Sequence, residues 1–148
     1  MYWEEKIDLL KQQYAPSEFS VPFTQWVAIS KEIERKFIIR AHSGPFRNWA
    51  ENIRGKTKLG GIGRGELVDY LSKLPSTANY WMVVVQGNDI NGKYYLYDCG
   101  IKPLTTLASL CNGDFYIVDK KYAWLVYFSL EKETGKINVY SGSDSPFQ

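Results

Sequence analysis

A chain of 148 residues with 45% apolar and 23% charged side chains has the composition of one globular domain, long enough to bury a core without disulfides or metal. Its net charge of +2 is too small to indicate nucleic acid or a membrane surface as the partner. No apolar run approaches the length of about 18 residues that a membrane-spanning helix needs. Residues 1–6 are charged and lack the apolar core of a signal peptide, so we expect a cytoplasmic protein with reduced thiols.

The front half of the chain, residues 1–75, carries helical patterns. Trp3, Ile7, Leu10 and Tyr14 recur every three to four residues, which predicts one apolar face of an amphipathic helix. Similar spacing predicts three further helices, over residues 23–38, 46–53 and 66–74.

The second half, residues 80–140, changes to strand-forming patterns rich in aromatic and β-branched side chains. Five strands are expected, over residues 80–86, 94–97, 115–118, 122–129 and 136–140. A short helix is expected between the second and third strands, over about 104–111, because its apolar residues have helical spacing and Asn112-Gly113 follows. The small polar tail 141–148 is expected to fray.

Helices first and hairpin-linked strands afterwards predict an α+β fold, with N-terminal helices packed on a mainly antiparallel sheet of about five strands and one inserted helix. No linker divides the chain, so residues 1–148 form a single domain in this interpretation. The stretch 114–128 is the most informative, because both alternating sets of its last strand are apolar. Such a strand is central and covered on both faces, or covered on one face and used for binding on the other.

The glycine-rich segment 54–65, which we expect to be a loop, attracts attention because it contains Gly-Lys-Thr and many cations. A phosphate-binding P-loop needs a glycine where Ala50 stands, and a dinucleotide fingerprint needs a glycine where Glu66 stands, so both motifs are excluded. A weaker hypothesis keeps an anion-binding loop in front of a helix start, against the alternative of a solvated loop. Its contacts would be Arg54, Lys56, Lys58 and Arg64.

Catalytic chemistry has little support in the residues. His42 is the only histidine, and no nucleophile-elbow pattern accompanies it. Cys99 follows Asp98, whose carboxylate would raise the thiol pKa, while Cys111 lies on an apolar helix face and is expected in the core. The two cysteines and one histidine match no zinc pattern, so we expect neither an enzyme nor a cofactor.

Four aspartates lie near the predicted turns of the sheet, Asp89, Asp98, Asp114 and Asp119. Their spacing matches no calcium loop, and aspartate favours turns because its side chain bonds the local backbone. Asp114 also stands where an RNA-recognition strand would have an aromatic residue, which argues against RNA binding. The carboxylates would make one end of the sheet acidic, as suits a basic partner.

Residues 113–118 and 121–125, preceded by Tyr80-Trp81 and by 94–98, resemble small bacterial domains of unknown function in which a Phe-Tyr-Ile-Val strand leads into a Lys-Tyr-x-Trp-Leu strand. They also resemble, more faintly, immunity proteins of the SUKH (Smi/Knr-like) superfamily. The second resemblance implies an α+β protein that binds and neutralises a toxin.

Small size, many amphipathic aromatics and the lack of a catalytic constellation together predict a non-enzymatic bacterial protein that binds another protein, such as an immunity protein. The alternative is a small-ligand or phosphate-binding domain that uses loop 54–65. The residues expected to touch a protein partner belong to the turn after the third strand, namely Asp119, Lys120, Lys121, Tyr122 and Trp124.

Overall fold

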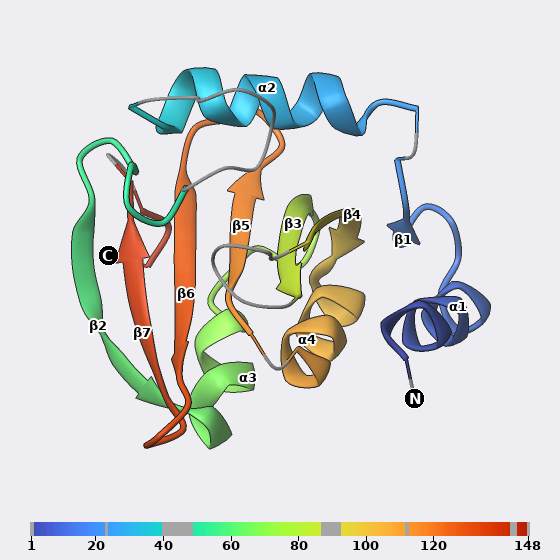
Figure 1. Cartoon of the computed structure of the whole chain (residues 1–148). Coiled ribbons are helices and arrows are strands. Elements are labelled where there is room, and N and C mark those ends of the chain that lie inside the picture. Colours follow the sequence, from blue (N-terminus) through green and yellow to red (C-terminus); the bar gives the residue numbers. More distant parts are fainter. Residues whose placement is uncertain are drawn as a thin grey trace.

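A computed structural model describes residues 2–22, 24–39, 49–86, 93–111, 113–142 and 145–147 of the chain (Figure 1). The helices in these ranges are α1 (Trp3–Gln13), α2 (Trp26–Phe37), the 3-10 helix η1 (Arg64–Glu66), α3 (Leu67–Leu71) and α4 (Ile101–Leu110). The strands are β1 (Phe19–Ser20), β2 (Thr57–Gly63), β3 (Asn79–Gln86), β4 (Lys93–Gly100), β5 (Phe115–Asp119), β6 (Leu125–Glu131) and β7 (Lys136–Ser141).

The strands form one antiparallel sheet in the order β1-β4-β3-β5-β6-β7-β2. The predicted α+β class with an antiparallel sheet is therefore confirmed. The strands with the longest apolar runs, β3, β5 and β6, occupy the interior of the sheet, where side chains on both faces must be covered.

Each face of the sheet has its own apolar core. Alternate residues of β5 and β6 divide between the two, with Phe115 and Phe128 on one face and Tyr116 and Tyr127 on the other. The first face packs against α1, α3 and α4, and the second packs against α2 and the segment 49–53. In Figure 1, α2 lies across the top of the strands, while α3 and α4 lie at the bottom. The aromatic stretch that dominates the sequence is thus buried on both sides.

The sheet has seven strands among the described residues, so the expectation of about five was wrong. The predicted loop 54–65 contains the edge strand β2, which pairs with β7. Its sequence is unusual for a strand because three of its seven residues are glycine. A bulge between Lys58 and Gly60, where Gly60 takes a φ of +151°, lets this glycine-rich segment follow β7.

A predicted helix and the start of a predicted strand also differ from the structure. The helix expected over 46–53 is absent from its described part, 49–53, because Ile53 forms an antiparallel bridge with Ile38 instead. Residues 46–48 lie outside the described residues. β6 begins at Leu125 rather than at residue 122, because Tyr122 has a φ of +57° and belongs to the preceding turn.

The tail predicted to fray contains groups that pack on the rest of the protein. Ser141 is buried at the end of β7. The ring of Phe147 stacks on Tyr70 of α3 with 4.4 Å between their centroids, and both rings contact Phe128 of β6 edge to face.

Candidate functional site

The two edges of the sheet differ in how far they are protected against pairing with a further strand. β2, at one edge, carries Lys58, a bulge and several glycines, which are features that discourage another strand from adding. β4, near the other edge, pairs along all eight of its residues with β3. On its outer side, the pairing found among the described residues is with β1, through Asp98 and Cys99.

β1 is short because Pro22, two residues after its end, has no N–H to offer to a ladder. Within the described part of the chain, the outer side of β4 therefore has no strand partner from Lys93 to Tyr97. At about 3.3 Å per residue, these five residues make an open edge roughly 17 Å long.

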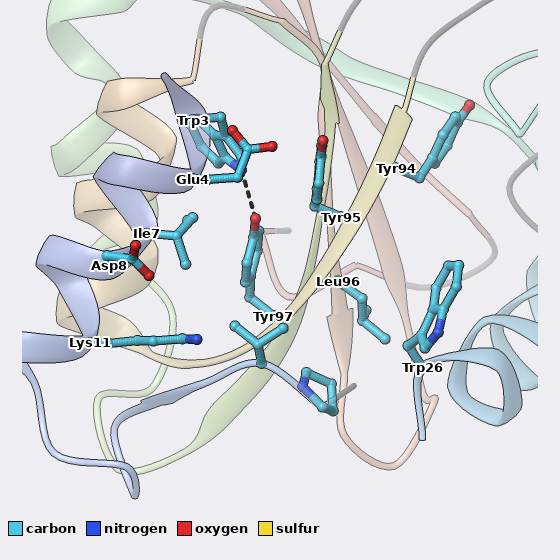
Figure 2. Close-up of a pocket in the computed structure, with 12 residues that line it drawn as sticks. Trp3, Glu4, Ile7, Asp8, Lys11, Trp26, Tyr94, Tyr95, Leu96 and Tyr97 are labelled. Atoms are coloured by element: carbon cyan, nitrogen blue, oxygen red, sulfur yellow. Dashed lines mark hydrogen bonds between the residues drawn. The ribbon is translucent and has the colours of Figure 1, made fainter. Parts of the chain in front are cut away.

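A pocket of about 340 Å³ lies along this open edge. α1 forms one wall, and Trp26 at the start of α2 lies on the opposite side of β4 (Figure 2). The described residues that line it are Trp3, Glu4, Ile7, Asp8, Lys11, Val21, Pro22, Trp26, Tyr94, Tyr95, Leu96 and Tyr97. We call this pocket the β4 groove. Eight of these twelve residues are aromatic or branched aliphatic, which is the composition of sites that bury apolar side chains.

The wall nearest α1 is fixed by aromatic contacts. The Trp3 indole donates a hydrogen bond of 2.6 Å from Nε1 to the hydroxyl of Tyr97 (Figure 2). Tyr97 also stacks on Phe19 of β1, with 5.7 Å between ring centroids. Burial raises the pKa of Tyr97 above its ordinary value of about 10, so the hydroxyl stays protonated and uncharged well beyond neutral pH. The groove wall is therefore rigid and uncharged at this point.

The α1 wall of the groove carries acidic side chains toward its N-terminal end and a lysine further along, and we call these charged residues the rim. Glu4 and Asp8 follow each other at a spacing of one helical turn along α1, and Lys11 lies one turn further on. Figure 2 shows Glu4 beside the hydroxyl of Tyr95 and Lys11 at the opposite end of the helix. Burial, and secondly the Glu4 carboxylate, raise the pKa of Tyr95. The Glu4 end of the groove thus suits a cationic group.

The turn predicted to touch a partner is tied to the protein itself. The Asp119 carboxylate accepts hydrogen bonds from the backbone N–H groups of Lys121 and Ala123, at 3.3 and 3.1 Å. Lys120 Nζ lies 2.8 Å from Asp98 Oδ2 of β4 and 3.6 Å from the centroid of the Trp81 ring.

Of the other residues in this turn, Lys121 is exposed, whereas Trp124 packs against Tyr80 with 5.9 Å between centroids. Tyr122 is partly buried against the α2 core. The turn contacts β4 beside the groove, because Lys120 binds Asp98 and Asp98 directly follows the groove residue Tyr97 in that strand.

Two of the four cations predicted to bind an anion, Lys56 and Arg64, lie on opposite faces of the sheet. Lys56 donates to the backbone oxygen of Ala50 at 2.7 Å and lies 4.6 Å above the Tyr140 ring, on the α2 face. Arg64 lies at the C-terminal end of α4, where it donates to the oxygens of Ser109 and Cys111 at 3.2 and 2.9 Å. Arg54 and Lys58 are exposed. Arg64 thus complements the negative end of a helix dipole rather than an external anion.

The thiols are buried and unbridged. Burial raises the pKa of both Cys99 and Cys111, and the nearby Asp98 carboxylate adds to the effect at Cys99. Within the described residues no group of three or more histidine, cysteine and acidic side chains could hold a metal ion. His42 and Asp89 lie outside the described residues. No helix in the described ranges is long and apolar enough to span a bilayer.

Asp98, Asp114 and Asp119, the three described aspartates of the predicted acidic end, have separate structural roles. The Asp114 carboxylate accepts hydrogen bonds from the Tyr127 hydroxyl at 2.6 Å and from the Leu130 N–H at 3.1 Å. Asp98 is held by Lys120 and by the amide of Asn79, and Asp119 organises its own turn. The turn interpretation of Asp119 is confirmed by these bonds.

Sequence reasoning missed the β4 groove. Tyr94-Tyr95-Leu96-Tyr97 was correctly assigned to a strand, but nothing in that run says that its outer edge is left unpaired. Pro22, two residues after the end of β1, is the feature of the sequence that bears on it.

The fold and this groove define a class of protein, an antiparallel α+β domain with helices on both faces of the sheet and an aromatic-lined open edge. The chain belongs to a family of unknown function, DUF6756, whose profile matches residues 5–141. No curated protein sequence and no solved structure matches the chain.

Proposed function

We propose that this protein is a non-enzymatic binding domain that takes hold of another protein through the β4 groove. The observation that carries the proposal is the open edge of β4 inside an aromatic pocket. Aromatic side chains supply much of the binding energy at protein interfaces, since each buries a large area at a small entropic cost. Trp26 presents 38% of its surface to solvent beside this edge, so a partner has an aromatic anchor to cover.

The groove is favoured over the turn 119–124 because the turn's polar groups are already engaged. Asp119 and Lys120 are bound to other groups of this chain, and displacing those bonds would cost a partner part of its binding energy. An interface centred on the groove can extend onto Lys121, which is exposed. The resemblance to SUKH immunity proteins makes a toxin one partner of this kind.

Substitution in the groove tests the proposal. Tagged wild-type protein is used to capture partners from the native host, and from co-expression with the products of neighbouring genes. The Trp26→Glu variant is expected to lose a partner that wild type retains, because the substitution puts a charge into the apolar side of the groove. Val68→Glu is the matched control, since Val68 is 50% exposed on α3 and does not line the groove.

Two results would contradict the proposal. One is a partner that both variants retain equally, which would place the interface elsewhere. The other is the absence of any stable protein partner from the host or from the neighbouring genes. Circular dichroism of Trp26→Glu shows whether the variant has kept its fold.

A further inference from the structure

We infer that the β4 groove binds an extended segment of the partner protein as an added strand, paired with the backbone of β4 and carrying a basic side chain toward Glu4 and Asp8. This inference rests on the proposed function and specifies how the partner is recognised. Strand addition to an exposed sheet edge is a recurrent mode of peptide recognition, in which the main chain gives affinity and alternate side chains give specificity.

The backbone of β4 is oriented for such pairing. The Gly100 N–H donates to the oxygen of Glu18 at 2.7 Å, on the outer side of the strand. In an antiparallel ladder alternate residues direct both backbone groups to the same side, so Asp98 and Leu96 also face outward. Asp98 meets Ser20 of β1 there, whereas no strand of the described ranges lies opposite Leu96. The N–H and C=O of Leu96 are therefore where an added strand would form its central pair of hydrogen bonds.

The side chains around this edge suit a strand with two different faces. Tyr95 and Tyr97 lie on the α1 side of the sheet, while Leu96 lies on the α2 side near Trp26. An added strand would alternate in the same way. Its residues on the α1 side would meet rings and the carboxylates of Glu4 and Asp8 (Figure 2). Its residues on the other side would meet Leu96 and Trp26, which favours aliphatic side chains.

The charge of the rim selects one kind of occupant. Glu4 and Asp8 attract a lysine or arginine at their end of the groove. Edges that must stay single are guarded by inward charges, prolines or bulges, as at β2, and the stretch Tyr94–Tyr97 carries none of these. We therefore assign the groove to a segment of another protein with one basic residue followed by alternating apolar residues.

A selection experiment tests the inference. Short random peptides displayed on phage are selected on the protein, and the enriched peptides are synthesised. We expect alternating apolar positions with a lysine or arginine near one end. Methylation of the peptide backbone nitrogens, one at a time, should weaken binding about tenfold or more at every second residue and little between, because alternate N–H groups face β4.

Two further readouts locate the peptide. Hydrogen exchange at the Leu96 amide, followed by NMR, should slow at least tenfold on peptide binding. The double variant Glu4→Gln, Asp8→Asn should lose several-fold in affinity for the basic peptides, with a weaker dependence on salt. Glu5→Gln is the matched control, because Glu5 is exposed on α1 but does not line the groove.

The outcomes separate this inference from the proposed function. Peptides that are lost with Trp26→Glu, but show no alternation on methylation and no protection of Leu96, would overturn strand addition and leave protein binding in place. Failure to enrich any peptide would overturn strand addition as well. Dimers of the chain that Trp26→Glu dissociates would show that a second copy occupies the edge, which would also overturn it.

Discussion

The indole Nε1 of Trp3 donates a hydrogen bond of 2.6 Å to the hydroxyl of Tyr97, and this bond joins α1 to β4 across 94 residues of sequence. Both rings line the β4 groove, so the same contact holds the helix on the sheet and shapes the proposed binding surface.

Replacing Trp3 with Phe should lower the free energy of unfolding by about 1 kcal/mol or somewhat more, because the buried Tyr97 hydroxyl loses its donor and some ring contact is lost. Tyr97→Phe should cost a similar amount. In a double-mutant cycle by urea unfolding, the double variant should lose less than the sum of the two single losses. Strict additivity would show that the bond contributes nothing to the folded state.

Alkaline pH should destabilise the protein through Tyr97. Burial raises the pKa of this hydroxyl, and the hydrogen bond from Trp3 lowers it by less. Above pH about 10 the unfolded chain loses the proton while the folded chain keeps it, so stability falls as pH rises, by about 1.4 kcal/mol per pH unit for this group. Tyr97→Phe should show a shallower decline in urea unfolding across that range, and parallel profiles for the two proteins would contradict this.

Gly113 should tolerate no larger side chain. A Cβ at this position would lie 2.7 Å from the backbone oxygen of Val85, and the Val85 N–H is itself bonded to the oxygen of Asp114 at 2.9 Å. We expect Gly113→Ala to lose about 2 kcal/mol, seen as a melting temperature lower by roughly 4–8 °C. Gly65→Ala is the control, because no atom lies within 4 Å of its Cβ, and an equal loss there would refute the steric explanation.

Lys120 and Lys121 should differ although they are neighbours. Lys120→Ala removes the contacts with Asp98 and with the Trp81 ring, and we expect it to cost about 1 kcal/mol, because the lysine is only partly exposed. Lys121→Ala should change stability by less than about 0.5 kcal/mol, since its side chain is exposed. Guanidinium unfolding of both variants measures the difference, and equal effects would show that the Lys120 contacts add no stability.

Several elements followed directly from local pattern. The helical spacing of Trp3, Ile7 and Leu10 predicted α1, and the apolar run around Val84 predicted β3. In contrast, β2 was interpreted as a loop because its glycines carry no strand propensity. It is a strand because β7 provides the ladder and a sheet edge tolerates glycine.

Candidate sites were harder to predict than elements. Lys56 and Arg64 belong to one basic segment but lie at the two ends of β2. Arg64 bonds carbonyl oxygens at the end of α4, whereas Lys56 lies over Tyr140 on the opposite face of the sheet. Charge clustering in a sequence does not survive when the segment is a strand. An extended run of seven residues separates its two ends by roughly 23 Å, and the bulge between Lys58 and Gly60 interrupts the alternation of faces along it.

The sequence by itself determined that the stretch 114–128 would form strands with two apolar faces, and it left open whether a helix or a partner covers the second face. The structure buries residues 115–118 and 125–128 on both faces within the chain. The two strands of this stretch, β5 and β6, lie in the interior of the sheet. Only the tertiary structure decided where a partner could add to that sheet. An unpaired edge depends on which strand ends up outermost and how far its neighbour extends, and β1 leaves β4 after two residues. Strand order is set by contacts between distant segments, and no periodicity within a segment records it.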